Sequence, residues 1–197
     1  MAANSTATKL ANASPACAGP VGIWSSRRIP LMPLDNPLWH YALKLYAKPG
    51  VEQAALELQN AGCSINRLLL ACFLARRGER LTPDMLSGEA LEWQRELTHP
   101  LRVLRYRIRN RKSERPELDA FYRRLREAEL AAEQVELSLL WESIESGERP
   151  AAPAGESLAR TNLQVVLADA GPTLVPRFSA QLEILVHAAF GSDLASD

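Results

Sequence analysis

The sequence predicts an all-α protein, a compact bundle of about six to eight helices. Apolar residues recur at the spacing of one helical face, most clearly in the first predicted segment. Residues that begin or end helices, chiefly Pro, Gly, Ser, Thr and Asn, separate such segments. No segment alternates apolar and polar residues over a sustained stretch, so no sheet is predicted. The first apolar face consists of Leu38, Tyr41, Ala42, Leu45 and Tyr46.

Three helices are predicted in the N-terminal part of the chain. Asn36 suits the N-cap of the first, which has proline at its first turn and ends at the Pro-Gly turn of residues 49–50. The second spans about 51–61. Ser64 suits the cap of the third, at 65–77, whose run LLLACFLA is apolar nearly all round. This pattern predicts that the third helix is the central buried one.

Four or five further helices are predicted to follow. Thr82 suits the cap of a fourth helix that extends to about Leu97, with a possible pause at 87–88. Thr98-His99-Pro100 is predicted to break the helical pattern, because proline disrupts a helix interior. The remaining helices are predicted at 100–112, 116–146, 156–170 and 175–190, with a linker-like turn at 150–155.

Residues 35–190 are predicted to form a single helical domain. Residues 1–34 are rich in small and polar residues that bury too little apolar area to offset their ordering entropy, which predicts a disordered tail. Met32 is an alternative translation start, and residues 191–197 are predicted to be flexible. No apolar run reaches the length of a membrane span, so we expect a cytoplasmic protein with no membrane partner.

The two charge signs fall in adjacent blocks, although the whole chain is neutral, with 23 basic and 23 acidic residues. Residues 95–126 contain eleven Arg or Lys and four Asp or Glu, a balance of +7. Residues 127–148 contain seven Glu and no basic residue, a balance of −7. The basic block, with the helix at 100–112, is a candidate surface for a protein partner or for nucleic acid. Its candidate partner-binding residues are Trp93, Arg102, Arg105 and Arg109.

The alternative interpretation of the two blocks is internal neutralisation. If the fifth and sixth helices form an antiparallel hairpin, Arg102 and Arg105 lie near Glu129 and Glu133. A heptad-like seam on the sixth helix also has two interpretations, a coiled-coil dimer face or the packing face of that hairpin. The small residues of the seam favour the hairpin, because they let a neighbouring helix approach. The seam consists of Leu118, Phe121, Leu125, Ala128, Ala132, Val135 and Leu139.

The sequence contains no recognisable catalytic or metal-binding motif, so the catalytic residues are unknown and no cofactor or metal is predicted. Glu129, Glu133 and Glu136 share one helical face but lack the Glu-x-x-His motif of di-metal bundles, so a solvated acidic face is predicted. The three cysteines lack metal-ligand spacing and are predicted to be free thiols. If the protein is a helical enzyme, carboxylates or His40 would have to converge in a cavity to act as catalytic residues.

Three segments carry a resemblance to a known family. They are LWHYALKLYAKPGVEQAALELQNAGCSINRLLL, HPLRVLRYRIRN and LREAELAAEQVELSLL. Together they resemble an uncharacterised proteobacterial family, domain of unknown function 2390, over about residues 36–190. The resemblance implies a small cytoplasmic helical protein and assigns no reaction, cofactor or site residue.

These observations predict a protein-interaction or adaptor module, with a protein as the expected partner. The alternative is a nucleic-acid-binding module that uses the arginine-rich helix at 100–112. A second alternative is a helical enzyme with a cavity that the sequence does not reveal. The oligomeric state is left open.

Overall fold

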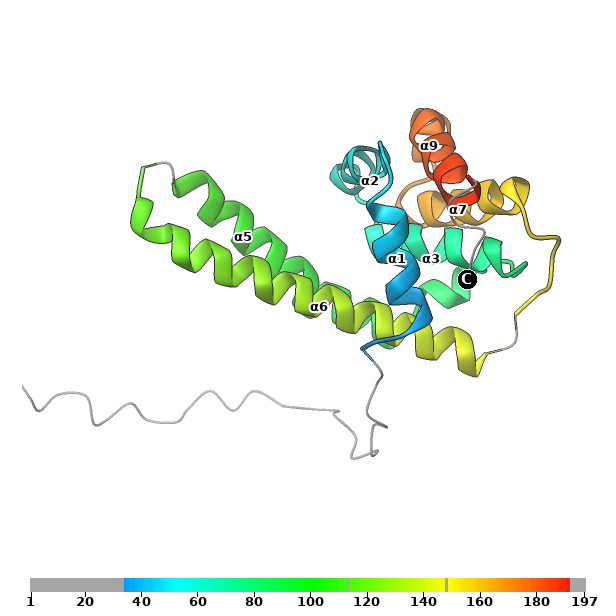
Figure 1. Cartoon of the computed structure of the whole chain (residues 1–197), viewed down its shortest axis with the longest axis horizontal. Helices are drawn as coiled ribbons and strands as arrows, with labels where there is room; N and C mark the ends of the chain where they lie inside the picture. Colours follow the sequence, from blue (N-terminus) through cyan, green and yellow to red (C-terminus); the bar gives the residue numbers. More distant parts are fainter. Residues whose placement is uncertain (1–33, 113, 148, 192–197) are drawn as a thin grey trace, which may run out of the picture. The chain divides into compact units, whose positions relative to one another are not determined.

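Helix α3 (Ile65–Arg76) forms the centre of the fold, as its apolar circumference predicts (Figure 1). The computed structural model describes residues 34–112, 114–147 and 149–191. Residues 66–75 of α3 are all buried. The helices packed against α3 include α1 (Pro37–Tyr46), α2 (Val51–Asn60), α7 (Glu156–Ala170) and α9 (Ser179–Phe190). The all-α prediction is confirmed.

Two of the three predicted helix caps are confirmed. The Asn36 side chain accepts a hydrogen bond from the backbone N–H of Trp39 at 2.9 Å. Ser64 Oγ accepts one from the backbone N–H of Arg67 at 3.5 Å. Thr82 lies at the predicted position but makes no side-chain cap bond, because the chain there forms only the short 3₁₀ turn η1 (Pro83–Leu86). A continuous helix from Thr82 is therefore wrong, but the predicted pause at residues 87–88 is confirmed, because the next α-helix begins only at Glu89.

The predicted helix break at residues 98–100 is also wrong. Helix α4 (Glu89–Trp93) continues into the π-helical turn η2 (Gln94–Thr98), which continues into α5 (His99–Arg111). Thr98 itself has helical torsions, with φ −60° and ψ −48°. A proline ring in an α-helix clashes with the carbonyl four residues earlier. The wider π turn changes the hydrogen-bond register just before Pro100 and lets the helical path continue.

Helix α6 (Asp119–Ser146) is the longest and has two different environments. Its C-terminal half enters the core through residues such as Leu137, Leu140 and Ile144. Its N-terminal half pairs with α5 as an antiparallel hairpin that extends from the other helices, joined by the turn η3 (Pro116–Leu118) (Figure 1). The hairpin interpretation of the seam is confirmed.

The seam of α6 is covered unevenly. Leu125, Ala132 and Leu139 are buried, whereas Phe121 is 48% exposed and Ala128 is exposed. Only α5 covers the N-terminal half of α6, and one helix covers only part of such a seam. The seam therefore includes apolar side chains that the hairpin itself leaves open.

The last predicted helix, at 175–190, is two helices in the structure. The short α8 (Leu174–Arg177) ends at Phe178, whose φ of −114° and ψ of 27° interrupt the helix before α9. An isolated β-bridge between Glu79 and Ala151 joins the loop after α3 to the loop after α6. None of the described helices has the length and apolar character needed to cross a membrane. The predictions for the N-terminal tail, for Met32 and for residues 192–197 lie outside the described residues.

Candidate partner-binding site

The base of the hairpin neutralises part of the arginine-rich block internally. Glu129 is 5% exposed and accepts hydrogen bonds from two arginines of α5. Arg102 Nε lies 3.0 Å from Glu129 Oε1, and Arg105 Nε donates to Glu129 Oε2. Arg102 also donates to Glu133 Oε1 at 2.6 Å. The predicted pairing of Arg102 and Arg105 with Glu129 and Glu133 is confirmed.

These pairs are buried enough to change the ionisation of their members. Burial alone lowers the pKa of Arg102, but the carboxylates of Glu133 and Glu129 raise it above its usual value. Hydrogen bonding to Glu129 raises the pKa of Arg105. Burial raises the pKa of Glu133 despite the nearby Arg102. We refer to these four side chains, Arg102, Arg105, Glu129 and Glu133, as the proximal cluster.

Glu136 follows one turn along α6 and is buried, with 1% of its surface exposed. Burial raises its pKa to about 7, against the lowering effect of the nearby Thr98 and Asn66. Ser64 Oγ lies 3.4 Å from Glu136 Oε1, and within the described ranges Oε2 has no partner at hydrogen-bond distance. The predicted solvated acidic face is therefore wrong for Glu129 and Glu136, because α5 and the start of α3 cover them.

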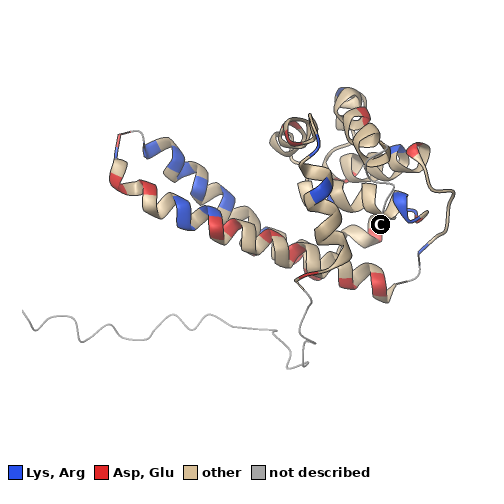
Figure 2. Ribbon diagram, viewed as in Figure 1, with Lys and Arg blue, Asp and Glu red and all other residues tan. Residues whose placement is uncertain are grey.

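The outer part of the hairpin, residues 106–128, differs from its base, and we call it the distal hairpin. It contains eight basic and four acidic residues, a balance of +4. Figure 2 shows the basic residues along α5 and the start of α6. Some of the basic residues form ion pairs within the distal hairpin. Lys112 Nζ lies 3.2 Å from Asp119 Oδ1, and Arg124 Nη1 lies 2.9 Å from Glu127 Oε2.

Five arginines of the distal hairpin form no ion pair with any residue that the structure describes. All five are exposed. The guanidinium of one, Arg109, lies 4.8 Å from the centre of the Tyr106 ring, which fits a cation–π contact. Such a contact leaves the positive charge uncompensated. The five, called here the unpaired arginines, are Arg107, Arg109, Arg111, Arg115 and Arg126.

The four candidate residues that the sequence suggests have different surroundings in the structure. Arg102 and Arg105 belong to the proximal cluster, and Arg109 to the unpaired arginines. Trp93 lies at the base of the hairpin, where its Nε1–H donates to the carbonyl of Ala132 at 2.9 Å. Among the four, only Arg109 presents an exposed charge without a carboxylate partner in the described part of the chain.

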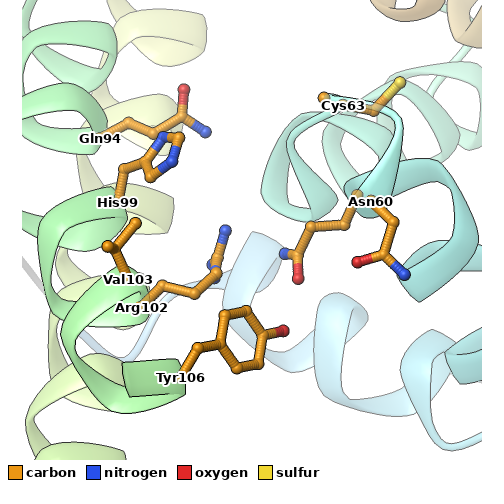
Figure 3. Close-up of a pocket in the computed structure, with 9 residues that line it drawn as sticks. Asn60, Cys63, Gln94, His99, Arg102, Val103 and Tyr106 are labelled. Carbon is orange, nitrogen blue, oxygen red and sulfur yellow. The ribbon is translucent and has the colours of Figure 1, made fainter. Parts of the chain in front are cut away.

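A cavity of about 300 Å³ lies between the start of α5 and the turn that joins α2 to α3 (Figure 3). Arg102 and Tyr106 face it from α5, opposite Asn60. No carboxylate lines this cavity, and His40 pairs elsewhere with Asp35 at 2.6 Å. The described residues also contain no cluster of His, Cys, Asp or Glu suited to a metal ion. The other lining residues are Gln59, Gly62, Cys63, Gln94, His99 and Val103.

Part of the chain is similar to a known protein family. Residues 37–140 match the family described as Protein of unknown function (DUF2390). The chain belongs to the DUF2390 family. The match covers α1 to residue 140 of α6 and therefore the paired part of the hairpin, whereas α7, α8 and α9 follow it. No curated protein and no solved structure matches the chain.

Within the DUF2390 region, sequence reasoning missed the distinction between paired and unpaired arginines. Arg105 and Arg109 lie one turn apart on the same helix, yet only Arg105 reaches a glutamate. The position of glutamates along α6 is the signal that separates them, because Glu129 and Glu133 lie opposite the base of α5. Further out along α6, Asp119 and Glu127 pair with Lys112 and Arg124. Reading that signal requires the hairpin register. Nothing in the sequence predicted that Arg102 and the other lining residues would enclose a cavity.

Proposed function

We propose that this protein is a protein-interaction module that binds an acidic partner surface through its distal hairpin. The observation that carries the proposal is the set of five exposed arginines without a carboxylate partner among the described residues. The neighbouring Arg102 and Arg105 are neutralised by buried glutamates. An acidic partner supplies the counter-charges that the distal hairpin lacks.

The composition of the hairpin favours a protein partner over nucleic acid. Seven of the eight basic residues in the distal hairpin are arginines, and arginine is enriched at protein interfaces whereas lysine is depleted. Exposed apolar side chains, including Leu104 at 38% and Phe121 at 48%, accompany them. Nucleic-acid surfaces instead combine a positive field with aromatic rings that are free for base stacking. In this hairpin, Tyr106 contacts Arg109 and Tyr122 contacts Lys112. The neutral whole chain supplies no such general field.

Affinity capture of the full chain from its own cells, after nuclease treatment, tests the proposal. We expect a protein partner to be recovered with the wild type and lost from the double variant Arg107→Glu/Arg109→Glu. The matched control is Arg80→Glu/Arg177→Glu, which makes the same change in net charge on two exposed arginines outside the hairpin. The control is expected to keep the partner.

Three outcomes would overturn the proposal. The first is equal recovery of the partner with both double variants. The second is recovery of nucleic acid in place of a protein when nuclease is omitted. The third is recovery of the protein alone. Each variant is first compared with the wild type by circular dichroism, so that loss of binding is separated from loss of folding.

A further inference from the structure

The hairpin has one open side that is apolar in the middle and basic at its edges. Helix α5 contains four aliphatic residues, yet none of its residues is buried. Of the eight large apolar side chains that are exposed in the described part of the chain, five lie on η2, α5 and α6. Those five are Leu97, Val103, Leu104, Phe121 and Leu130, of which Leu104 and Phe121 lie on this side.

The ion pairs of the proximal cluster define the two sides of the hairpin. Arg102 and Glu129 meet on the side that also carries Tyr106 and the cavity. Residues three, four or seven apart share a helical face. Leu101, Leu104 and Ile108 therefore share a face of α5 that lies on the opposite side from Arg102.

The second helix contributes to the same open side. On α6, Phe121 and Ala128 are seven residues apart and lie on the side away from Glu129. In an antiparallel pair with the observed contacts, Ala128 lies opposite Leu104, and Phe121 lies further out near the end of α5. The five residues form what we call the apolar stripe: Leu101, Leu104, Ile108, Phe121 and Ala128.

The charges beside the stripe indicate which kind of partner it binds. Arg107 and Arg111 lie on the outer edge of α5, one turn from Leu104 and Ile108, and neither is paired with a described carboxylate. A second copy of the chain would bring its own distal hairpin, with a balance of +4, against these arginines. Like charges at such a distance repel, so the charge pattern disfavours self-association and favours an acidic partner.

We infer that the apolar stripe is the docking site for an acidic amphipathic helix of another protein, which completes a three-helix bundle with α5 and α6. This inference rests on the proposed function and specifies the partner of the same surface. From Leu101 to the level of Arg111, where Phe121 lies across from the end of α5, the stripe extends roughly 15 Å at 1.5 Å per residue. A partner helix of three to four turns, about 14 residues, covers it, with leucines facing the stripe and glutamates facing the arginines.

A synthetic peptide tests this geometry directly. The probe is an acetylated and amidated helix of about 14 residues with leucines on one face and glutamates along both edges. Its binding to the full chain is measured by fluorescence anisotropy. We expect it to bind at least about tenfold more tightly than a scrambled peptide of the same composition. Equal binding of the two peptides would mean that charge alone drives association and would overturn the inference.

Paired variants then locate the binding surface. Leu104→Ser/Phe121→Ser is expected to weaken peptide binding at least about tenfold, whereas Leu130→Ser, on the outer face of α6, leaves it unchanged. Arg107→Glu/Arg111→Glu is expected to weaken binding more than Arg109→Glu/Arg126→Glu, whose arginines lie on the other side of the hairpin. The substituted side chains are exposed or half-buried, and circular dichroism verifies that each variant folds.

Two further measurements identify other occupants. A dimer detected by light scattering and lost in Leu104→Ser/Phe121→Ser would assign the stripe to a second copy of the chain. Binding to anionic lipid vesicles, but not to the peptide, would assign it to a lipid surface. Either result overturns the inference. If a captured partner is lost from Arg107→Glu/Arg109→Glu but kept by Leu104→Ser/Phe121→Ser, the proposed function stands and the helix-docking inference falls.

Discussion

The base and the end of the α5–α6 hairpin differ in how they use the same residue type. At the base, Arg102 and Arg105 are half-buried and hydrogen-bonded to buried glutamates. Toward the end, Arg107, Arg109 and Arg111 are exposed and form no ion pair with the described residues. One short helix thus contains arginines that pair with glutamates of α6 and arginines whose charge no described carboxylate neutralises. The net charge of a segment therefore does not reveal the role of each charged side chain until its ion-pair partner is known.

Reversing charge at the base is expected to have the largest effect. The double variant Arg102→Glu/Arg105→Glu places two additional carboxylates beside the buried Glu129 and the half-buried Glu133. Breaking a buried ion pair costs about 3 to 5 kcal/mol. We expect the free energy of unfolding, measured by urea denaturation, to fall by at least about 3 kcal/mol. The comparison variant is Arg107→Glu/Arg111→Glu, with an expected change within about 0.5 kcal/mol because exposed side chains contribute little. Similar losses in both variants would contradict the distinction between base and end.

Glu136 is expected to give the clearest pH dependence. Its pKa in the folded protein is raised from 4.5 to about 7, so the folded state binds this proton more tightly than the unfolded state does. Wild-type stability contributed by this group is therefore present below about pH 4.5 and is lost as pH rises through about 7. Glu136→Gln removes the titration, so its stability relative to wild type should rise over that interval by up to about 3 kcal/mol.

The control for this measurement is Glu127→Gln, which changes an exposed glutamate of the same helix. Unfolding is measured in urea at several pH values for both variants and the wild type. The rise between about pH 4.5 and about pH 7 is expected in Glu136→Gln and should exceed any change in the Glu127→Gln difference. A Glu136→Gln difference that is constant with pH would show that Glu136 ionises normally in the folded protein.

The sequence predicted the helices well, because their signals are local. The caps Asn36 and Ser64 and the apolar run of α3 each act within one or two turns, and all three predictions hold. The error at Pro100 has a physical cause, since a π turn is a tertiary adjustment that periodicity does not report. Burial of Glu136 likewise depends on the approach of α3, far away in sequence.

The candidate site was predictable only in part. The pairing of Arg102 with Glu129 follows from the hairpin and the two charge blocks, and it is confirmed. The exposed state of Phe121 contradicts its place in a regular heptad seam, because only one helix covers that part of α6. Sequence periodicity reports which faces are apolar, but the number of neighbouring helices decides which of them are covered.

A smaller effect is expected for Trp93, which lies at the base of the hairpin and donates a hydrogen bond to α6. Trp93→Phe keeps an aromatic ring but removes the N–H that donates to the carbonyl of Ala132. Loss of a hydrogen bond of this kind costs about 1 kcal/mol. Trp39→Phe is the matched control, because its indole N–H donates no hydrogen bond to another described residue. Equal loss of stability in the two variants, measured by urea denaturation, would mean that packing of Trp93 matters and its hydrogen bond does not.

The smallest expected effect concerns salt and the distal hairpin. Its balance of +4 makes the unpaired arginines repel one another, and salt screens repulsion between exposed charges over about 10 Å at 0.1 M ionic strength. Raising the sodium chloride concentration should therefore stabilise the wild type by a few tenths of a kcal/mol, roughly the size of exposed charge interactions. In Arg107→Glu/Arg111→Glu, whose distal hairpin has a balance of zero, this gain should disappear. Thermal unfolding monitored at 222 nm by circular dichroism, at about 0.05 M and about 0.5 M salt, measures it. An equal gain in stability in both proteins would show that the salt effect arises elsewhere in the molecule. It would contradict the electrostatic difference between the base and the end of the hairpin.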